Sequence, residues 1–290
     1  MTVHSPEQDP DHIVQAAVDA LGGHAYPPIH CLLYGESGAG KSTFLSTFPK
    51  PMLVMGFDPY DKMAPYTRYG KVVPLSDPAV VQEYQKLGIE AKDVVHKQTG
   101  DLLIRIEHYV DADPARPNAF NAFETRMVSF ASEASQWATV GLDSLTFLMR
   151  ASMVRAQYNK PMQLYAPGTD TRQWYGMVKF DIESVLMSRA PWWDTNVVIC
   201  CHTKEDKDEF AEGVLRGIRA PGTLSKDGPA GFGETYRAHI AKTKEKDGSL
   251  MRKYMLQTRS DTLWFANSVV CQAPDPCEAH YVNLWANFEG

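Results

Sequence analysis

The chain has 290 residues, of which 44% are hydrophobic and 22% charged, a composition typical of a globular protein with a sizeable core. Its formal net charge of -6 excludes a generally basic surface, so a nucleic-acid site would have to be local. No apolar stretch approaches the ~20 residues of a membrane span, and no signal peptide opens the sequence. We therefore expect a cytoplasmic protein.

The first elements are predicted as a leader followed by a buried strand. Residues 1–28 are polar and contain prolines, apart from an amphipathic stretch at 13–18 that predicts a small helix. We expect this leader to be partly flexible. The apolar run 29–34 then has the length and composition of a buried strand.

A glycine-rich octet follows that strand. Residues 35–42 read G-E-S-G-A-G-K-S and match the phosphate-binding pattern G-x-x-x-x-G-K-[ST]. Residues 42–48 can then form a helix that Pro49 ends, and strand, loop and helix is the context that this motif requires. A glycine-rich turn without function is the alternative, which this context disfavours. The motif predicts a site for a nucleoside triphosphate.

The chemistry of the octet explains its residue types. Its glycines let backbone N–H groups point inward at phosphate oxygens, and the helix N-terminus adds partial positive charge. Lys41 is expected to reach the β- and γ-phosphates, where it also assists catalysis, and the Ser42 hydroxyl to ligate Mg²⁺. The predicted nucleotide-binding residues are Gly35, Glu36, Ser37, Gly38, Ala39, Gly40, Lys41, Ser42 and Thr43.

The remaining elements alternate between strands and helices. Apolar runs predict strands at 51–58, 139–144, 196–202, 237–242 and 253–258, and helical spacing predicts helices at 121–137, 144–155 and 173–189. This alternation indicates an α/β fold, a mostly parallel central sheet with helices on both faces. We expect a core at 29–270 and a C-terminal tail at 271–290. Two segments of the core are expected to depart from this alternation of strands and helices. One is an irregular insertion at about 59–120, which contains one alternating run at 102–106, and the other is a long loop or hairpin at 203–233.

Polar residues at strand ends supply candidates for metal binding and hydrolysis. Asp143 ends one apolar run and is the predicted second Mg²⁺ ligand, although an acid there can also cap the next helix. Asp58 is the candidate for orienting the attacking water, with Asp61 as its substitute and a simple turn residue as the alternative. His202 can sense the γ-phosphate, or it can be satisfied by backbone groups alone.

The cysteines indicate a reducing environment. Their number is odd, and three of the five lie in apolar strand-like runs, so buried free thiols are expected. A zinc site at Cys271, Cys277 and His280 is disfavoured, because paired C-x2-C spacing and a fourth ligand are missing.

Several sequence blocks together resemble a known group of proteins. After the phosphate loop come a strand ending in an acid, T-V-G-L-D-S-L-T at 139–146, Gln173-Trp174, N-V-V-I-C-C-H-T-K at 196–204 and A-P-G-T-L at 220–224. In this order they are similar to the phage-encoded RecA-like P-loop ATPases of the single-strand-annealing recombinase type, over about residues 28–270.

The resemblance implies a RecA-like fold, ATP as the nucleotide, single-stranded DNA as partner and assembly into rings or filaments with ATP between subunits. It also implies the host cytoplasm as location. By position, Asp143 is the family's second-motif acid and His202 its γ-phosphate-sensing residue.

Two departures from the family pattern stand out. Asp58 occupies a position where the family usually has Glu, and the shorter side chain predicts slow hydrolysis or a bridging water. The family's late basic residue that reaches the neighbour's ATP has no clear counterpart near Asn267, so Arg259, Arg252 and Lys253 are candidates.

In this fold, single strands bind to loops that follow the third and fourth core strands. Residues 150–175 and 203–233 fit that position. The first segment mixes basic with aromatic side chains, which suits phosphates and unstacked bases. The second mixes basic with acidic ones, and a solvated charged face is the alternative for each. Their basic residues are Arg150, Arg155, Lys160, Arg172, Lys204, Lys207, Arg216 and Arg219.

The predicted function is DNA-stimulated ATP hydrolysis in annealing or exchange of single strands during phage recombination. Three alternatives remain open: a small-molecule or nucleotide kinase, a motor or helicase acting on duplex DNA, and a binding module with negligible turnover.

Overall fold

The computed structural model describes residues 26–58, 63–111, 113, 115–159, 171–189, 194–207, 214–220, 224–244 and 250–287. Most of the predicted leader lies outside these residues, as do Asp61 and parts of both predicted DNA segments.

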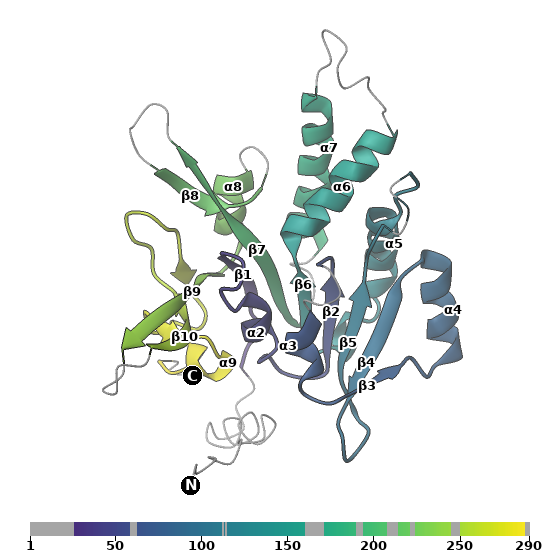
Figure 1. The fold of residues 1–290 in the computed structure, drawn as a ribbon, viewed down its shortest axis with the longest axis horizontal. Helices are drawn as coiled ribbons and strands as arrows, with labels where there is room; N and C mark the ends of the chain where they lie inside the picture. Colours follow the sequence, from purple (N-terminus) through teal and green to yellow (C-terminus); the bar gives the residue numbers. More distant parts are fainter. Residues whose placement is uncertain are drawn as a thin grey trace.

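A mostly parallel sheet forms the centre of the molecule (Figure 1). Its parallel strands lie in the order β9-β1-β7-β6-β2-β5. One strand, β7, therefore separates the strand before the phosphate loop from the strand that ends in Asp143. The bounds are β1 His30–Gly35, β2 Met52–Gly56, β5 Leu102–His108, β6 Thr139–Asp143, β7 Asn196–Lys207 and β9 Glu234–Lys244.

Antiparallel strands extend the sheet at both edges. Beyond β5 lie β4 (Glu90–Val95) and β3 (Lys71–Pro74), and beyond β9 lie β10 (Leu250–Gln257) and β12 (Cys277–Glu278). Two further strands pair off this path, β8 (Val214–Ile218) with β7 and β11 (Asn267–Ser268) with β9.

Helices cover both faces, and alternate strand residues point to each, as expected for a sheet buried on both sides. One layer packs against residues such as Leu53 and Val140, and the other against residues such as Val54 and Val198. The first layer consists of α4 (Pro78–Leu87), α5 (Ala119–Phe130), α6 (Leu145–Asn159), α7 (Arg172–Glu183) and η3 (Ser184–Arg189). The second consists of α2 (Lys41–Leu45), α3 (Ala64–Thr67) and α9 (Tyr281–Leu284). Short helical segments also occur at η2 (Ala134–Gln136), α8 (Leu224–Asp227) and η5 (Gly228–Gly231).

The predicted fold class is confirmed, with three corrections to individual elements. The span 59–120 is not irregular in its described part, because it contains α3, β3, α4, β4 and β5. Only residues 102–106 alternate clearly enough to reveal a strand. Strand β3 is a short, largely exposed edge strand, and β4, which lies between β3 and β5, carries three charged residues. The helix after the phosphate loop ends at Leu45, before Pro49. Strand β7 continues past His202, its predicted end, and forms a hairpin with β8, one of the two forms expected for residues 203–233.

The cysteines match their prediction. All five cysteines are buried and free. Among the described residues, no three His, Cys, Asp or Glu side chains converge as a metal site, and the trio Cys271, Cys277 and His280 is no exception. Within the same residues, no helix has the length and apolar character needed to cross a membrane.

Candidate functional site

The phosphate loop leaves β1 and turns back into α2 at the carboxyl edge of the sheet. Gly38 and Gly40 have φ angles of 79° and 87°, a left-handed conformation that favours glycine. A Cβ atom at Gly40 would also lie 2.5 Å from the ring of Tyr254 on β10. Since α2 has only five residues, phosphate binding here depends on loop amides and Lys41 more than on a helix dipole.

Lys41 is buried and points back into the loop. Its ammonium donates to the carbonyl oxygens of Gly35, at 3.0 Å, and Glu36, at 2.8 Å. Burial lowers the pKa of Lys41, and neighbouring groups that include Asp143 and Asp58 act in the opposite direction. A cation held by neutral carbonyls beside two acids can be drawn to an incoming triphosphate.

Asp143 and Ser42, the two predicted Mg²⁺ ligands, lie around one tyrosine hydroxyl. The Tyr66 hydroxyl donates to Asp143 Oδ2 at 2.7 Å and also hydrogen-bonds the Ser42 side chain. Tyr66 is fully buried, and Asp143 is 2% exposed. Two hard oxygen groups within reach of the same hydroxyl fit Mg²⁺, which takes few protein ligands and completes its shell with phosphates and water.

Asp58 lies next to Asp143, as the sequence predicted for strand ends at one sheet edge. It follows β2 and is 5% exposed, and its Oδ1 accepts from the Ser144 hydroxyl at 3.3 Å. The Phe57 amide donates to the Asp143 carbonyl at 2.7 Å, and a His108 ring nitrogen lies 2.7 Å from the Asp58 carbonyl oxygen. Asp58 is therefore fixed beside the candidate metal ligand.

His202 also reaches this edge. It pairs in register with Gly35, the first residue of the phosphate loop, and its amide donates to Thr146 Oγ1 at 3.0 Å. Its ring meets Phe147 edge-on, with centroids 5.9 Å apart. The half-buried imidazole thus lies between the phosphate loop and α6.

The two predicted DNA segments meet across one cavity of about 640 Å³. Arg150 on α6 and Tyr175 on α7 line one side, and Lys204 on β7 and Arg219 after β8 line the other. In Figure 1, the α6–α7 pair and the β7–β8 hairpin extend from the same edge of the sheet. The parts of both segments within 160–170, 208–213 and 221–223 lie outside the described residues.

The candidates for a cation that acts on a neighbouring subunit lie on or just after β10, the strand that also carries Tyr254 beside Gly40. Arg252 and Lys253 are exposed on β10, where Lys253 forms an ion pair with Glu278 at 3.6 Å. Arg259 follows the strand and lines a separate cavity of about 540 Å³.

Two aromatic residues of the site were missed by sequence reasoning. Tyr66 belongs to a span that was expected to be irregular. Tyr254 lies more than 200 residues after the phosphate loop along the chain. Neither belongs to a motif, so no local signal marks them.

The strand order, the phosphate loop and the acids beside it define a P-loop ATPase fold. Residues 27–268 match the AAA_24 family, described as an AAA domain, and the chain belongs to that family. No curated protein matches the sequence.

Distant similarity to solved structures accompanies this assignment. The flagellar accessory protein FlaH from Methanocaldococcus jannaschii is 10% identical, with 87% of this chain and 84% of that chain covered and a TM-score of 0.38. An ATPase from the type III secretion system of pathogenic bacteria is 12% identical, with 73% of this chain and 52% of that chain covered and a TM-score of 0.39. The RadB recombinase is 13% identical, with 83% of this chain and 93% of that chain covered and a TM-score of 0.33.

Proposed function

We propose that this ATPase binds single-stranded DNA and couples Mg²⁺-dependent ATP hydrolysis to annealing or exchange of strands in phage recombination. The supporting observation is the cavity between the α6–α7 pair and the β7–β8 hairpin. It joins two segments that were assigned to DNA from sequence, and it opens beside His202 at the edge that carries the phosphate loop.

In this proposal the nucleotide site works through residues that already surround one another. Loop amides and the Lys41 ammonium bind the β- and γ-phosphates, and Ser42 and Asp143 hold Mg²⁺. Asp58 orients the attacking water, and its short side chain gives slow turnover in the absence of DNA. The bound metal supplies charge neutralisation on the phosphates, and the protein residues supply position.

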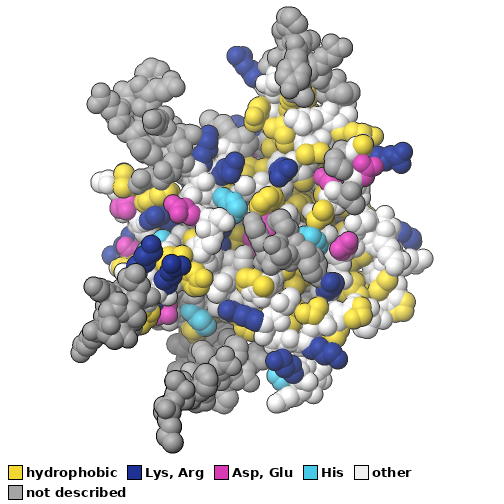
Figure 2. Space-filling view, in the orientation of Figure 1, with side chains coloured by type: hydrophobic (Ala, Val, Ile, Leu, Met, Phe, Trp, Pro, Cys, Tyr) yellow, Lys and Arg dark blue, Asp and Glu magenta, His cyan; other side chains and the backbone are white. Residues whose placement is uncertain are grey.

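The DNA side of the proposal depends on charge and exposed rings. Arg150, Lys204 and Arg219 are exposed, and Tyr175 is 55% exposed beside them. Figure 2 shows Lys and Arg side chains mixed with hydrophobic ones between the two projections. Such a mixture suits a single strand, whose phosphates take the cations while its bases stack on the rings.

Assembly completes the proposal. An ATPase of this type would place its nucleotide between subunits of a ring or filament, and Arg259, Arg252 or Lys253 would approach the neighbour's ATP. Arg252 is exposed on β10, where a neighbouring subunit can reach it, and Arg259 lines a cavity separate from the phosphate loop.

The test is ATP turnover without nucleic acid, with single-stranded DNA, with duplex DNA and with small acceptors, together with a mass measurement of the assembly. Stimulation by single strands supports the proposal. Preference for duplex indicates a motor, phosphate transfer indicates a kinase, and tight ATP binding without turnover under any condition indicates a binding module.

A paired variant tests the DNA surface itself. Arg150→Ala/Arg219→Ala should weaken single-strand binding and lower the slope of log affinity against log salt by about 1.4, because each phosphate contact contributes roughly 0.7. The control Lys71→Ala/Lys86→Ala removes the same charge from exposed positions on β3 and α4 and should leave the slope unchanged. An equal slope in both variants would contradict the assigned surface.

A further inference from the structure

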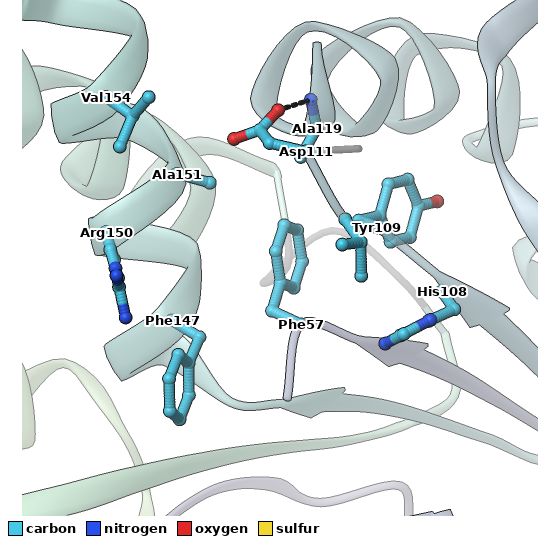
Figure 3. Close-up of a pocket in the computed structure, with 10 residues that line it drawn as sticks. Phe57, His108, Tyr109, Asp111, Ala119, Phe147, Arg150, Ala151 and Val154 are labelled. Atoms are coloured by element: carbon cyan, nitrogen blue, oxygen red, sulfur yellow. Dashed lines mark hydrogen bonds between the residues drawn. The ribbon is translucent and has the colours of Figure 1, made fainter. Parts of the chain in front are cut away.

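A second cavity, of about 550 Å³, lies on the other side of the first turns of α6. It is bounded by residues after β2 and β5, by the start of α5 and by α6 (Figure 3). Phe147 and Arg150 line both this cavity and the one that joins the two DNA segments. The two cavities are therefore neighbours that share an aromatic ring and a guanidinium group.

The walls of this second cavity are aromatic and aliphatic. Phe57 and Tyr109 stack with ring centroids 5.0 Å apart and an interplanar angle of 12°, and Phe147 adds a third ring. Along α6, Ala151 and Val154 complete the apolar surface (Figure 3). Such walls suit a planar, weakly polar group of ligand-like size.

The polar groups of the cavity are largely engaged within the protein. Asp111 Oδ1 accepts from the amides of Asn118 and Ala119, each at 2.7 Å, and the His108 ring contacts the Asp58 carbonyl. Arg150 differs, since it is exposed and no ion pair joins it to an acid among the described residues. An occupant is therefore recognised by stacking and by one cation at the mouth.

We propose that this cavity receives a nucleobase from the single strand that lies across Arg150, a step that rests on the proposed function. Arg150 binds the phosphate next to the inserted base, and the rings bind its face. Because every base has a π-face, and because Asp111 and His108 are occupied elsewhere, the site tolerates any sequence.

The cavity also has a direct physical connection to the hydrolytic edge. Phe57 precedes Asp58, and the Phe147 amide donates to the Ser144 carbonyl at 3.1 Å. Ser144 in turn contacts the Asp58 carboxylate. A base between Phe57 and Phe147 thus contacts both segments that position Asp58. Stimulation of ATP hydrolysis should therefore require bases as well as phosphates.

The experiment compares two single strands of equal length, one with 2-aminopurine bases and one abasic, for binding, fluorescence and ATPase stimulation. The wild-type protein should bind the base-containing strand about tenfold more tightly, as expected for stacking of one or two bases, and only that strand should stimulate turnover fully. Equal affinity and equal stimulation by both strands would overturn the inference and leave the proposed function intact. Binding of neither strand would contradict both.

Two cavity-filling variants and a control locate the effect. The two variants are Val154→Trp, on α6, and Val110→Trp, at a position 50% exposed on the opposite wall. In each, the affinity for the base-containing strand should fall to the affinity for the abasic strand. Val128→Trp, at a position 69% exposed on α5 and outside the cavity, should behave as wild type. If both filled variants fold and keep the tenfold preference, the inference is wrong.

A free nucleotide is the other source of a base. A 2-aminopurine nucleoside monophosphate is therefore titrated in parallel. If its binding is lost in Val154→Trp while the protein shows no preference between the strands, the cavity serves a free nucleotide, and the inference is overturned.

Discussion

Two clusters of buried charge use ionic groups in opposite ways. The first lies at the carboxyl edge of β1, β2 and β6 and contains Lys41, Asp58 and Asp143, which are 6%, 5% and 2% exposed. The second joins β5 to α5 through Glu107 and Arg126, whose side chains are 0% and 1% exposed. Both clusters are removed from water, so the difference between them lies in how their charges are matched.

The charges of the second cluster are matched within the protein. Arg126 Nε donates to Glu107 at 3.0 Å, and its terminal nitrogens donate to both oxygens of Glu133 at 2.9 Å. The hydroxyls of Tyr84 and Tyr109 also donate to Glu107. Burial acts to lower the pKa of Arg126, but the Glu107 and Glu133 charges outweigh it and raise that pKa. This cluster has no capacity left for a ligand.

The first cluster is arranged differently. Lys41 donates to two neutral carbonyls rather than to a carboxylate, and Asp143 accepts from the neutral Tyr66 hydroxyl. Buried charges that are positioned in this way mark a functional site, because a ligand with its own charges can complete the pairing. Burial alone therefore does not distinguish the site from the scaffold, whereas a buried ammonium held by carbonyl oxygens, as at Lys41, does.

The largest expected effect is on ATP affinity in Lys41→Ala. Loss of two charge-assisted contacts to phosphates, at about 1.5–3 kcal/mol each, should weaken binding by roughly 10²–10⁴-fold without unfolding the protein. A fluorescent ATP analogue measures the affinity. The control Lys50→Ala removes a lysine that donates to the carbonyls of Ser46 and Phe48 outside the loop, and it should keep wild-type affinity. Unchanged binding in Lys41→Ala would refute the site.

The next effect is on stability, in Arg126→Ala. Leaving Glu107 buried without its partner should lower the free energy of unfolding by about 3–5 kcal/mol, whereas the ATP affinity of the folded molecules stays the same. Urea unfolding measures the loss. The double variant Glu107→Gln/Arg126→Met removes both charges and should lose less. A double variant as unstable as the single one would contradict the claim that Glu107 and Arg126 match each other's charge.

Asp58→Asn should slow ATP turnover by about 10²-fold, because the amide cannot take a proton from the attacking water. ATP affinity should change little. Asp77→Asn, at the exposed N-cap of α4, is the matched control and should turn over ATP normally. Normal turnover in Asp58→Asn would assign the role to Asp61 or another acid.

The smallest expected effect is on metal affinity in Tyr66→Phe. Without the hydroxyl that orients Asp143 and contacts Ser42, the nucleotide complex should bind Mn²⁺ about tenfold more weakly, as for other groups that orient metal ligands. Electron paramagnetic resonance of Mn²⁺ measures this, and nucleotide affinity without metal should be unchanged. Tyr84→Phe, whose hydroxyl contacts Glu107 instead, should alter stability and not Mn²⁺ affinity. Equal Mn²⁺ affinity in both variants would leave Tyr66 with a packing role only.

Much of the fold followed from local patterns. Apolar runs located β1, β2 and β6 within two residues at each end, since a strand buried on both faces needs continuous apolar sequence. Strands β3 and β4 were missed because β3 has only four, largely exposed residues and β4 carries three charged ones, so neither gives that signal. Arg126 was missed because the helical pattern of Phe123, Met127 and Phe130 was read only for its apolar members.

The candidate site was predicted unevenly for a related reason. The phosphate loop is contiguous, and Asp58 and Asp143 end apolar strands, so each was visible without knowing its neighbours. Tyr66 and Ser144 act through side chains brought from elsewhere, and no spacing rule connects them to the acids that they contact.

By itself, the sequence determined the class of protein, the nucleotide loop and the order of the core strands and helices outside residues 59–120, because these depend on motifs and periodicities within a few tens of residues. Only the tertiary structure decided which distant groups meet. Tyr66 reaches Asp143 across 77 positions, Glu107 pairs with Arg126, and α6 places Phe147 and Arg150 between two cavities. The physical reason is that such contacts depend on sheet register and helix packing, which arise from the whole core and are not encoded at either residue alone.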